Sequence, residues 1–334
     1  MDAQKRITER APLLDERGVV TPGYSERSLL RYDRRAIKAA PWRVKEWDFY
    51  QISDGEKCVQ FTIGHVSYAG SVSASLFAFD GRRRVERTKM LALPFGRLGM
   101  PTDAEAEGTL EYADRGIRMR FESAGARRLL RCAAKDFQAE IDLERKNPYS
   151  MVVAIPFEGD RRAFYYNQKI NCMRAEGTVR AEGEEYRFKS DSAFGLLDWG
   201  RGVWPFSHEW YWSNGTGTVA GDMFGFNLGC GFGDTSAATE NMLFYRGRAH
   251  KLGKVRFDLD SDYMKAWRFR DDEGRLDLTM TPRFDHHTKT SAVFMRTECH
   301  QVFGSFTGRA ILDDGSALEI DGLTAFAEHA VNRW

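Results

Sequence analysis

The feature that most constrains the fold is an alternation of apolar and polar residues with a period of two. It recurs over much of the chain, for example at residues 117–122, 137–143, 254–260 and 275–280. Each segment has the side-chain pattern of a strand with one buried face and one face in water. Turn-forming residues follow such segments at 80–81, 272–274 and 313–315. Short strands joined by tight turns predict an antiparallel, all-β protein.

One helix is expected ahead of most of these strands. Residues 25–38 begin with Ser25, a residue type that caps helices, and are followed by Pro41, which cannot continue one. Leu30 and Ile37 would share the apolar face of this helix. The sequence therefore predicts a short N-terminal helix.

The length of the chain favours two domains. Its 334 residues exceed what one hydrophobic core usually holds, and two domains of about 150 residues each are expected. Many short strands in a chain of this size favour two sandwiches or two barrels, and closed barrels leave no open edges. The polar run at 190–192 and the glycines after it suggest a boundary near residue 190. The predicted domains are 1–190 and 191–334.

Charge and composition argue against several partners. The chain has 49 Lys and Arg residues against 48 Asp and Glu, so no overall field attracts nucleic acid or an anionic membrane. The N-terminal residues lack the apolar run of a secretory signal, and no window approaches the ~18 apolar residues of a membrane span. The five cysteines contain no Cys-x-x-Cys pair and are expected to be reduced. These features predict a cytoplasmic protein with no nucleic-acid partner and no stable membrane insertion.

Aromatic residues are concentrated at 198–214, which holds four of the eight tryptophans of the chain. They are Trp199, Trp204, Trp210 and Trp212, and Asp198 and His208 lie among them. Flat aromatic side chains give a pocket apolar walls at little entropic cost, and a few polar groups fix the orientation of a ligand. This segment is the expected binding site for a small, largely apolar molecule.

His208 and Asp198 each have a functional and a structural interpretation. Alternation places His208 with Trp210 and Trp212 on one strand face, where burial would disfavour its charge and make it an acid or base near neutral pH. The alternative is a histidine that is hydrogen-bonded within its strand. Asp198 lies near glycines and would bind backbone amides in a tight turn. Beside the aromatic wall, desolvation would instead raise its pKa and let it protonate an alkene or a leaving group. Indoles facing the same space would stabilise a developing cation by about 0.5–2 kcal/mol each.

Neighbouring segments supply further candidates. The strand at 221–231 has glycines at 225, 229 and 231 on one face, with Asn227 as the only polar side chain there. Such glycines mark curvature of the sheet or the close approach of another group. Glu240 and Asn241 precede an apolar run, a position typical of ligand-facing groups or of capping residues. Asn167 and Lys169 share a strand face and suit an anion or a carbonyl, with surface exposure as the alternative for the lysine.

Other chemistries have less support. His286, His287 and Asp285 are metal-binding residue types, but adjacent strand residues point to opposite faces and no second ligand cluster is near, so no metal is expected. No glycine-rich loop has nucleotide-binding spacing, and no Gly-x-Ser-x-Gly elbow is present. No cofactor is expected. Glu328 and His329, close to the C-terminus, are interpreted first as packing residues and second as site residues.

Several segments together resemble a bacterial family catalogued as domain of unknown function 2804. They are 43–50, 164–169, 198–212, 239–242 and 326–330, and the resemblance spans most of the chain. That family has no assigned activity, but it is similar in organisation to a wider lipocalin-like group that includes carotenoid 1,2-hydratases and fungal cyclases of polyketide chains. The resemblance implies two consecutive lipocalin-like domains with a ligand cavity. An aspartate close to a tryptophan recurs in the wider group, and Asp198-Trp199 and His208-Glu209-Trp210 each match pieces of that motif.

The sequence thus predicts a hydratase-like, ligand-binding protein of two lipocalin-like β-barrel or sandwich domains, acting by cofactor-free acid–base chemistry on a small, largely apolar molecule. Hydration, isomerisation and cyclisation all fit. The expected catalytic residues are Asp198, His208 and Glu240, and the expected substrate-binding residues are Asn167, Lys169, Trp199, Trp204, Trp210, Trp212, Asn227 and Asn241. One alternative is a carrier of a lipid or isoprenoid, and another is a carbohydrate-active enzyme with Asp198 and Glu240 as paired carboxylates.

Overall fold

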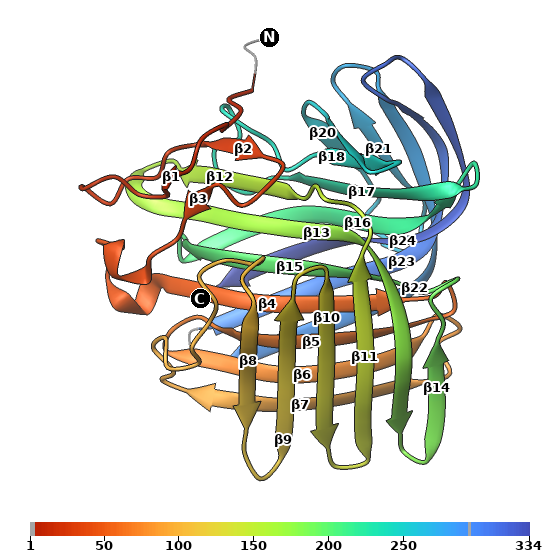
Figure 1. Ribbon diagram of the computed structural model, residues 1–334, viewed down its shortest axis with the longest axis horizontal. Coiled ribbons are helices and arrows are strands. Elements are labelled where there is room, and N and C mark those ends of the chain that lie inside the picture. Colours follow the sequence, from red (N-terminus) through yellow and green to blue (C-terminus); the bar gives the residue numbers. More distant parts are fainter. Residues whose placement is uncertain (1–3, 293–294) are drawn as a thin grey trace.

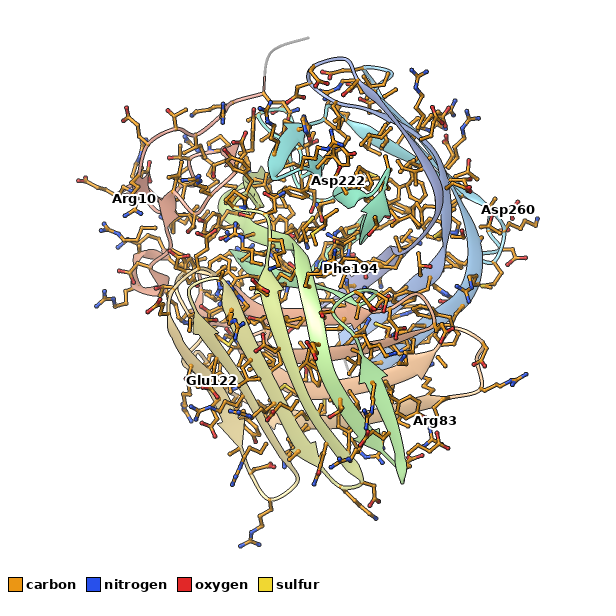
Figure 2. All side chains as sticks on the ribbon, turned by 45° about the vertical axis from the view of Figure 1, so that its right-hand side comes forward. Arg10, Arg83, Glu122, Phe194, Asp222 and Asp260 are labelled. Atoms are coloured by element: carbon orange, nitrogen blue, oxygen red, sulfur yellow. The ribbon has the colours of Figure 1, made fainter. Side chains whose placement is uncertain are left out.

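The computed structural model describes residues 4–292 and 295–334. It is built mainly of two large curled antiparallel sheets, with a small two-stranded sheet near the N-terminus (Figure 1). The predicted all-β fold is confirmed, because among the described residues only two single-turn 3₁₀ helices accompany the strands. Segments 117–122 and 137–143 lie in adjoining parts of one sheet and show the alternating burial that their sequence predicts. Charged side chains such as Arg10 and Asp260 lie on the outside (Figure 2).

The first sheet has thirteen strands, and its central path runs β7-β6-β5-β4-β15-β13-β11-β10-β9-β8. Its strands are β2 (Gly23–Ser25), β4 (Val44–Ser53), β5 (Lys57–His65), β6 (Ala69–Ala78), β7 (Arg84–Ala92), β8 (Gly108–Ala113), β9 (Ile117–Ala124), β10 (Arg127–Ala134), β11 (Phe137–Arg145), β12 (Met151–Phe157), β13 (Asp160–Ala181), β14 (Glu184–Phe188) and β15 (Phe194–Val203). The strand β15 pairs with β4 and β13, which are far from each other in the sequence. Residues from three distant segments therefore meet at the centre of this sheet.

The second sheet has nine strands in the order β19-β18-β17-β16-β24-β23-β22-β21-β20. They are β16 (Ser207–Val219), β17 (Asp222–Cys230), β18 (Met242–Tyr245), β19 (Arg248–Lys251), β20 (Val255–Asp258), β21 (Trp267–Asp271), β22 (Leu276–Ala292), β23 (Met295–Ile311) and β24 (Ala317–Arg333). The predicted turns at 272–274 and 313–315 join β21 to β22 and β23 to β24. Gly274 and Gly315 have φ values of 71° and 82°, which glycine adopts without steric cost.

The predicted helix at 25–38 is wrong. Ser25 ends β2, and Leu30 begins β3 (Leu30–Arg31), which pairs in parallel with β1 (Ala11–Pro12). Only η1 (Arg34–Ala36) makes a helical turn in this segment, followed by η2 (Pro41–Arg43). Leu30 packs into the first core, and the two apolar side chains of the predicted face were too few to favour a helix over extended pairing.

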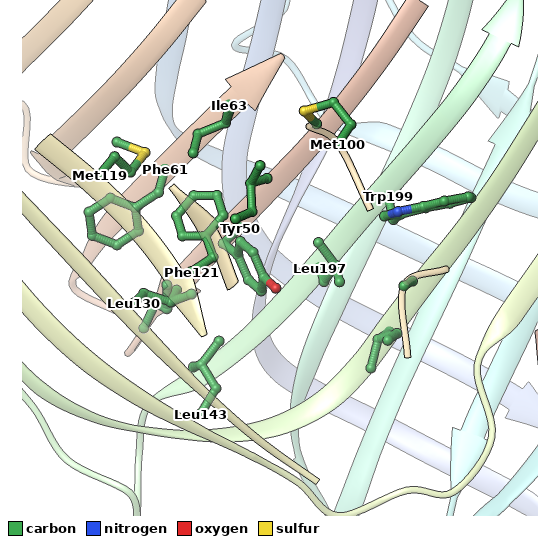
Figure 3. Packing of buried hydrophobic residues seen from close by; sticks show 14 of the residues in the cluster. Tyr50, Phe61, Ile63, Met100, Met119, Phe121, Leu130, Leu143, Leu197 and Trp199 are labelled. Carbon is green, nitrogen blue, oxygen red and sulfur yellow. The ribbon is translucent and has the colours of Figure 1, made fainter. Parts of the chain in front are cut away.

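Each sheet encloses its own hydrophobic core. The first contains Tyr50 and Phe121, whose rings meet edge to face at 4.8 Å, together with Leu143 and Leu197 (Figure 3). The second is built around side chains such as Trp267 and Phe306. Further apolar clusters join the sheets, since Phe77 and Leu196 from the first pack with residues of the second. The strands β13 and β15 are consequently buried on both faces over most of their length.

The chain passes from the first sheet to the second at residues 204–206, between β15 and β16. The domain division near residue 190 stays a prediction, while the change of sheet itself falls later because β15 is a central strand of the first sheet. Among the described residues, no helix has the length and hydropathy needed to cross a bilayer.

Candidate functional site

A cavity of about 800 Å³ lies between the two sheets. Its walls include side chains of β4, β5, β13 and β15 from the first sheet and of β16, β23 and β24 from the second. Aromatic residues form much of the wall: Trp47, Phe49, Tyr165, Trp204, Trp210, Trp212, Phe232 and Trp334. Three of the four predicted tryptophans are among them.

A glycine allows Trp47 to lie flat against β15. A Cβ atom on Gly200 would lie 1.9 Å from Cζ2 of Trp47, so no other residue type fits there without moving the indole. Trp47 in turn meets Trp204 edge to face at 4.9 Å and stacks with Tyr165 at 6.3 Å. The aromatic wall therefore rests on close packing across neighbouring strands.

Asp198 and Lys169 form an ion pair on the cavity wall. The two residues are cross-strand neighbours in β15 and β13, and Nζ of Lys169 lies 2.8 Å from Oδ1 of Asp198. The amide of Asn167 donates to the same oxygen over 2.6 Å. The ammonium also lies 3.7 Å from the ring centroid of Trp212, a cation–π distance. Asn167 and Lys169 thus share a face, as the alternation predicts, and both are buried.

Glu240 approaches the cavity beside Gly229. A Cβ on that glycine would lie 2.3 Å from Oε1 of Glu240, so the bare face of β17 makes room for a carboxyl group. Asn227 donates to the backbone oxygen of Glu240 over 2.7 Å and to Oε2 over 3.4 Å. Burial raises the pKa of Glu240; Lys169 opposes this shift and Asp198 adds to it. The close approach of the Glu240 side chain explains why residue 229 is a glycine.

Gly229→Ala is expected to displace the carboxyl of Glu240 and to lower the free energy of unfolding by about 1–3 kcal/mol, as overpacking does in buried sites. Urea denaturation measures the change. Gly116→Ala is the matched control, because its new Cβ would meet nothing closer than 3.5 Å. Equal stability of the two variants would contradict the close approach of Glu240.

Glu328 is a further carboxyl group on the cavity wall, and the sequence interpretation treated it first as a packing residue. Trp210 donates its indole N–H to Oε1 over 2.8 Å, and Gln301 donates to Oε2 over 3.2 Å. Burial raises the pKa of Glu328 to about 7; Trp210 and Lys169 oppose the shift, and Asp198 reinforces it. The available signal was the alternation in β24, which places Glu328 on the face of the apolar Phe326.

The charges around Lys169 are unbalanced. Asp198, Glu240 and Glu328 all line the cavity, and among the described residues only Asp198 makes an ion pair with Lys169. Neither Glu240 nor Glu328 has a salt-bridge partner in the described ranges, although both are buried. Taking an unpaired carboxylate out of water is costly, so these groups keep their protons to higher pH than usual. The site can hold a neutral carboxylic acid beside the ion pair of Asp198 and Lys169.

His208 shares a strand face with Trp210, as the sequence predicts, but neither His208 nor Trp199 lines the cavity. Nδ1 of His208 lies 3.0 Å from the Pro205 oxygen, and Nε2 accepts from Nε1 of Trp334 over 2.8 Å. Burial lowers the pKa of His208 to about 4, so the ring is neutral and both nitrogens have partners, which does not favour it as a proton donor. Trp199 points to the opposite face of β15 from Asp198 and packs in the first core against Tyr166. It is not part of the cavity wall.

Asn227 and Asn241 support the wall from behind. The amide oxygen of Asn227 accepts from Nε1 of Trp212 over 2.7 Å and from Asn214 over 3.0 Å. Asn241 accepts from the backbone N–H of Gly229 and donates to the oxygen of Gly253. Neither asparagine lines the cavity; Asn227 holds Trp212 and Glu240, which do, and Asn241 holds Gly229 next to Glu240.

Comparisons with known proteins agree on the fold. The family described as "domain of unknown function (DUF2804)" matches residues 4–334. No curated protein matches the chain. Kievitone hydratase from Nectria haematococca is similar in structure, with a TM-score of 0.56 and 9% identity over 86% of this chain and 88% of that one.

Two further solved structures share this architecture. CghA in its complex with Sch210972 gives a TM-score of 0.55 and 11% identity, covering 96% of this chain and 98% of that one. A protein from Nitrosomonas europaea catalogued as AttH gives 0.52 and 14%, covering 90% and 96%. These likenesses establish the lipocalin-like fold that the sequence resemblance implied.

Proposed function

The chain belongs to the family described as domain of unknown function (DUF2804), and for this member we propose cofactor-free acid–base catalysis on a small, largely apolar molecule held between the two sheets. The observation that carries the proposal is that three buried carboxyl groups of the aromatic cavity, those of Asp198, Glu240 and Glu328, lie near the Lys169 ammonium. A structural neighbour is a hydratase by name, which is consistent with this reaction type.

The roles follow from the contacts of each carboxyl group. Glu328 is the proton donor, because its pKa of about 7 leaves it protonated in much of the population near neutral pH. Asp198 is held by the Lys169 ammonium and the Asn167 amide, which makes it a fixed base or counter-charge. Glu240, which has no ion pair in the described ranges, is a second group able to carry a proton.

A hydration illustrates the chemistry. The proton of Glu328 adds to a carbon–carbon double bond, and the cation that forms faces the indoles of Trp210 and Trp212. Water attacks the cation and forms the new C–O bond, and its surplus proton returns to the Glu328 carboxylate. Attack by another group of the same molecule would give cyclisation, and loss of a neighbouring proton would give isomerisation. General acid catalysis of this kind contributes about 10²–10⁴ in rate.

The test begins with the ligand. Native mass spectrometry of the purified protein, followed by solvent extraction, identifies what co-purifies. We expect an apolar molecule, such as an isoprenoid, a fatty acid or a polyketide, and turnover of it or of an unsaturated analogue. Glu328→Gln should lower that turnover by about 10²–10⁴ while the ligand still binds. Glu122→Gln, outside the cavity, is the control.

Other outcomes decide between the functions. A ligand that binds equally to wild type, Glu328→Gln and Asp198→Asn, and that is never converted, would establish a carrier and overturn the proposal. Asp198 and Glu240 both line the cavity, so a panel of soluble glycosides tests the carbohydrate alternative. Hydrolysis of a glycoside that depends on both residues would replace the present proposal.

A further inference from the structure

Three histidines stand in a row across the second sheet. His287 in β22 is the direct cross-strand neighbour of His300 in β23, which in turn neighbours His329 in β24. The rings of His287 and His300 lie parallel, with centroids 4.0 Å apart and an interplanar angle of 5°. Tyr263 stacks on the other side of His300 at 3.9 Å and fixes its plane. The pairing of two distant segments thus brings together imidazoles that sequence spacing does not reveal.

A carboxylate completes a ligand set beside two of these rings. One ligand atom each of His287, His300 and Glu298 lie within 4.8 Å of one another. Nε2 of His287 is 3.3 Å from Oε1 of Glu298. Donors bound to one tetrahedral zinc ion are about 3.3 Å apart, given Zn–N and Zn–O bonds of roughly 2.0–2.2 Å. Imidazole lone pairs lie in the ring plane, so the rings of His287 and His300 must tilt out of their parallel stack for the three residues to share an ion.

His300 also has the outer partner that metal-binding histidines usually have. Its Nδ1 lies 2.7 Å from Oδ2 of Asp285, which leaves Nε2 available and fixes the ring orientation. His329 differs from the other two, because Tyr263 and Glu209 occupy both of its nitrogens. The hydrogen-bond partners therefore distinguish His287 and His300 from His329.

Two cations compete for the carboxylate. Lys289 lies 3.0 Å from Oε1 of Glu298, and Arg296 lies 2.9 Å from Oε2. An ion at this place displaces or repels the nearer ammonium, which weakens binding without removing a ligand. The competition supplies a test, because loss of the lysine charge should strengthen a real site.

We propose that His287, His300 and Glu298 bind a divalent transition metal ion of the zinc type, with Asp285 orienting His300. Two imidazoles and one carboxylate suit Zn²⁺ and its neighbours rather than Ca²⁺ or Mg²⁺, which prefer all-oxygen sites. The fourth position faces solvent, since the side chain of His287 is 41% exposed. The ion would join β22 to β23 at the edge of the cavity, whose lining includes His287. This proposal corrects the expectation that no second ligand cluster lies near His287.

Calorimetric titration of the full chain with zinc chloride, after treatment with a chelator, tests the site. We expect one equivalent bound, a large loss of affinity in His287→Ala and His300→Ala, and a ~10–100-fold loss in Asp285→Asn. His286→Gln, on the opposite strand face, is the control that should bind normally. Lys289→Gln should bind more tightly than wild type. Cobalt substitution should add the visible absorption of a four-coordinate ion, and His287→Ala should abolish it.

Two results of the zinc titration would contradict the proposed site. Absence of zinc binding by both wild type and Lys289→Gln would overturn the site. Binding that persists in His287→Ala would place the ion elsewhere. Circular dichroism of each variant separates loss of a ligand from loss of the fold, and the Lys289→Gln result does not depend on removing any ligand.

Discussion

Lys169→Met is expected to lower the free energy of unfolding by about 3–5 kcal/mol, the usual cost of removing one partner of a buried ion pair. The side chains of Lys169 and Asp198 are 3% and 9% exposed, so water cannot replace the lost ammonium. Asp198 would retain only the Asn167 amide as a donor on Oδ1. Glu240 and Glu328 would lose the same favourable charge. Urea denaturation at neutral pH measures the loss.

The double variant Lys169→Met/Asp198→Asn should recover much of this stability, because residue 198 then no longer carries a charge without its partner. Lys45→Met is a matched control. Lys45 also lines the cavity and is buried, but no carboxylate among the described residues forms a salt bridge with it. Burial lowers the pKa of Lys45 to about 8, so its removal should cost little stability or none. Equal losses for the two lysines would show that packing of the side chains, and not charge pairing, dominates.

Glu328→Gln is expected to make the protein more stable than wild type above pH 7. The pKa of Glu328 is raised from 4.5 to about 7, so the native state binds more protons than the unfolded state between these values. Stability contributed by this group is therefore complete below pH 4.5 and is lost as the pH rises through 7. The shift corresponds to about 3 kcal/mol at 1.36 kcal/mol per pKa unit. Glutamine has the shape of the protonated acid and cannot ionise.

The measurement is the free energy of unfolding of both proteins at several pH values. The difference between variant and wild type should grow in favour of the variant from pH 4.5 to pH 8. Glu9→Gln, at an exposed position, controls for the loss of one negative charge. A difference that stays constant over this range would contradict the raised pKa of Glu328.

The strands that could be predicted from the sequence are those with one buried face and one solvent-exposed face. Segments 117–122 and 137–143 alternate because one side of each strand meets the first core and the other meets solvent. The central strand β15 reads as an almost continuous buried run, since both of its faces are covered. This strand belongs to the first sheet because it pairs with β4 and β13. The same pairing explains why the chain changes sheet only at 204–206. Such long-range pairing leaves no local pattern.

The candidate site was predictable to a similar extent. Local alternation placed Asn167 with Lys169 and His208 with Trp210, and the structure agrees with these faces. It could not show that Lys169 faces Asp198, because their contact depends on the register of two strands. The glycine at 229 was compatible with curvature or with an approaching group, and only the position of Glu240 decides. Glu328 was interpreted first as a packing residue, because no local pattern shows that an acidic residue close to the C-terminal tryptophan faces a cavity.

The central claim is that a carboxylic acid stays neutral in the cavity and can donate its proton. Infrared difference spectroscopy of wild type against Glu328→Gln, at pH 6 and at pH 9, tests it most directly. The account predicts a C=O stretching band of a neutral carboxylic acid at pH 6 that is absent from the variant and lost in wild type by pH 9. A Glu328 that gives only carboxylate bands at pH 6 would contradict the account.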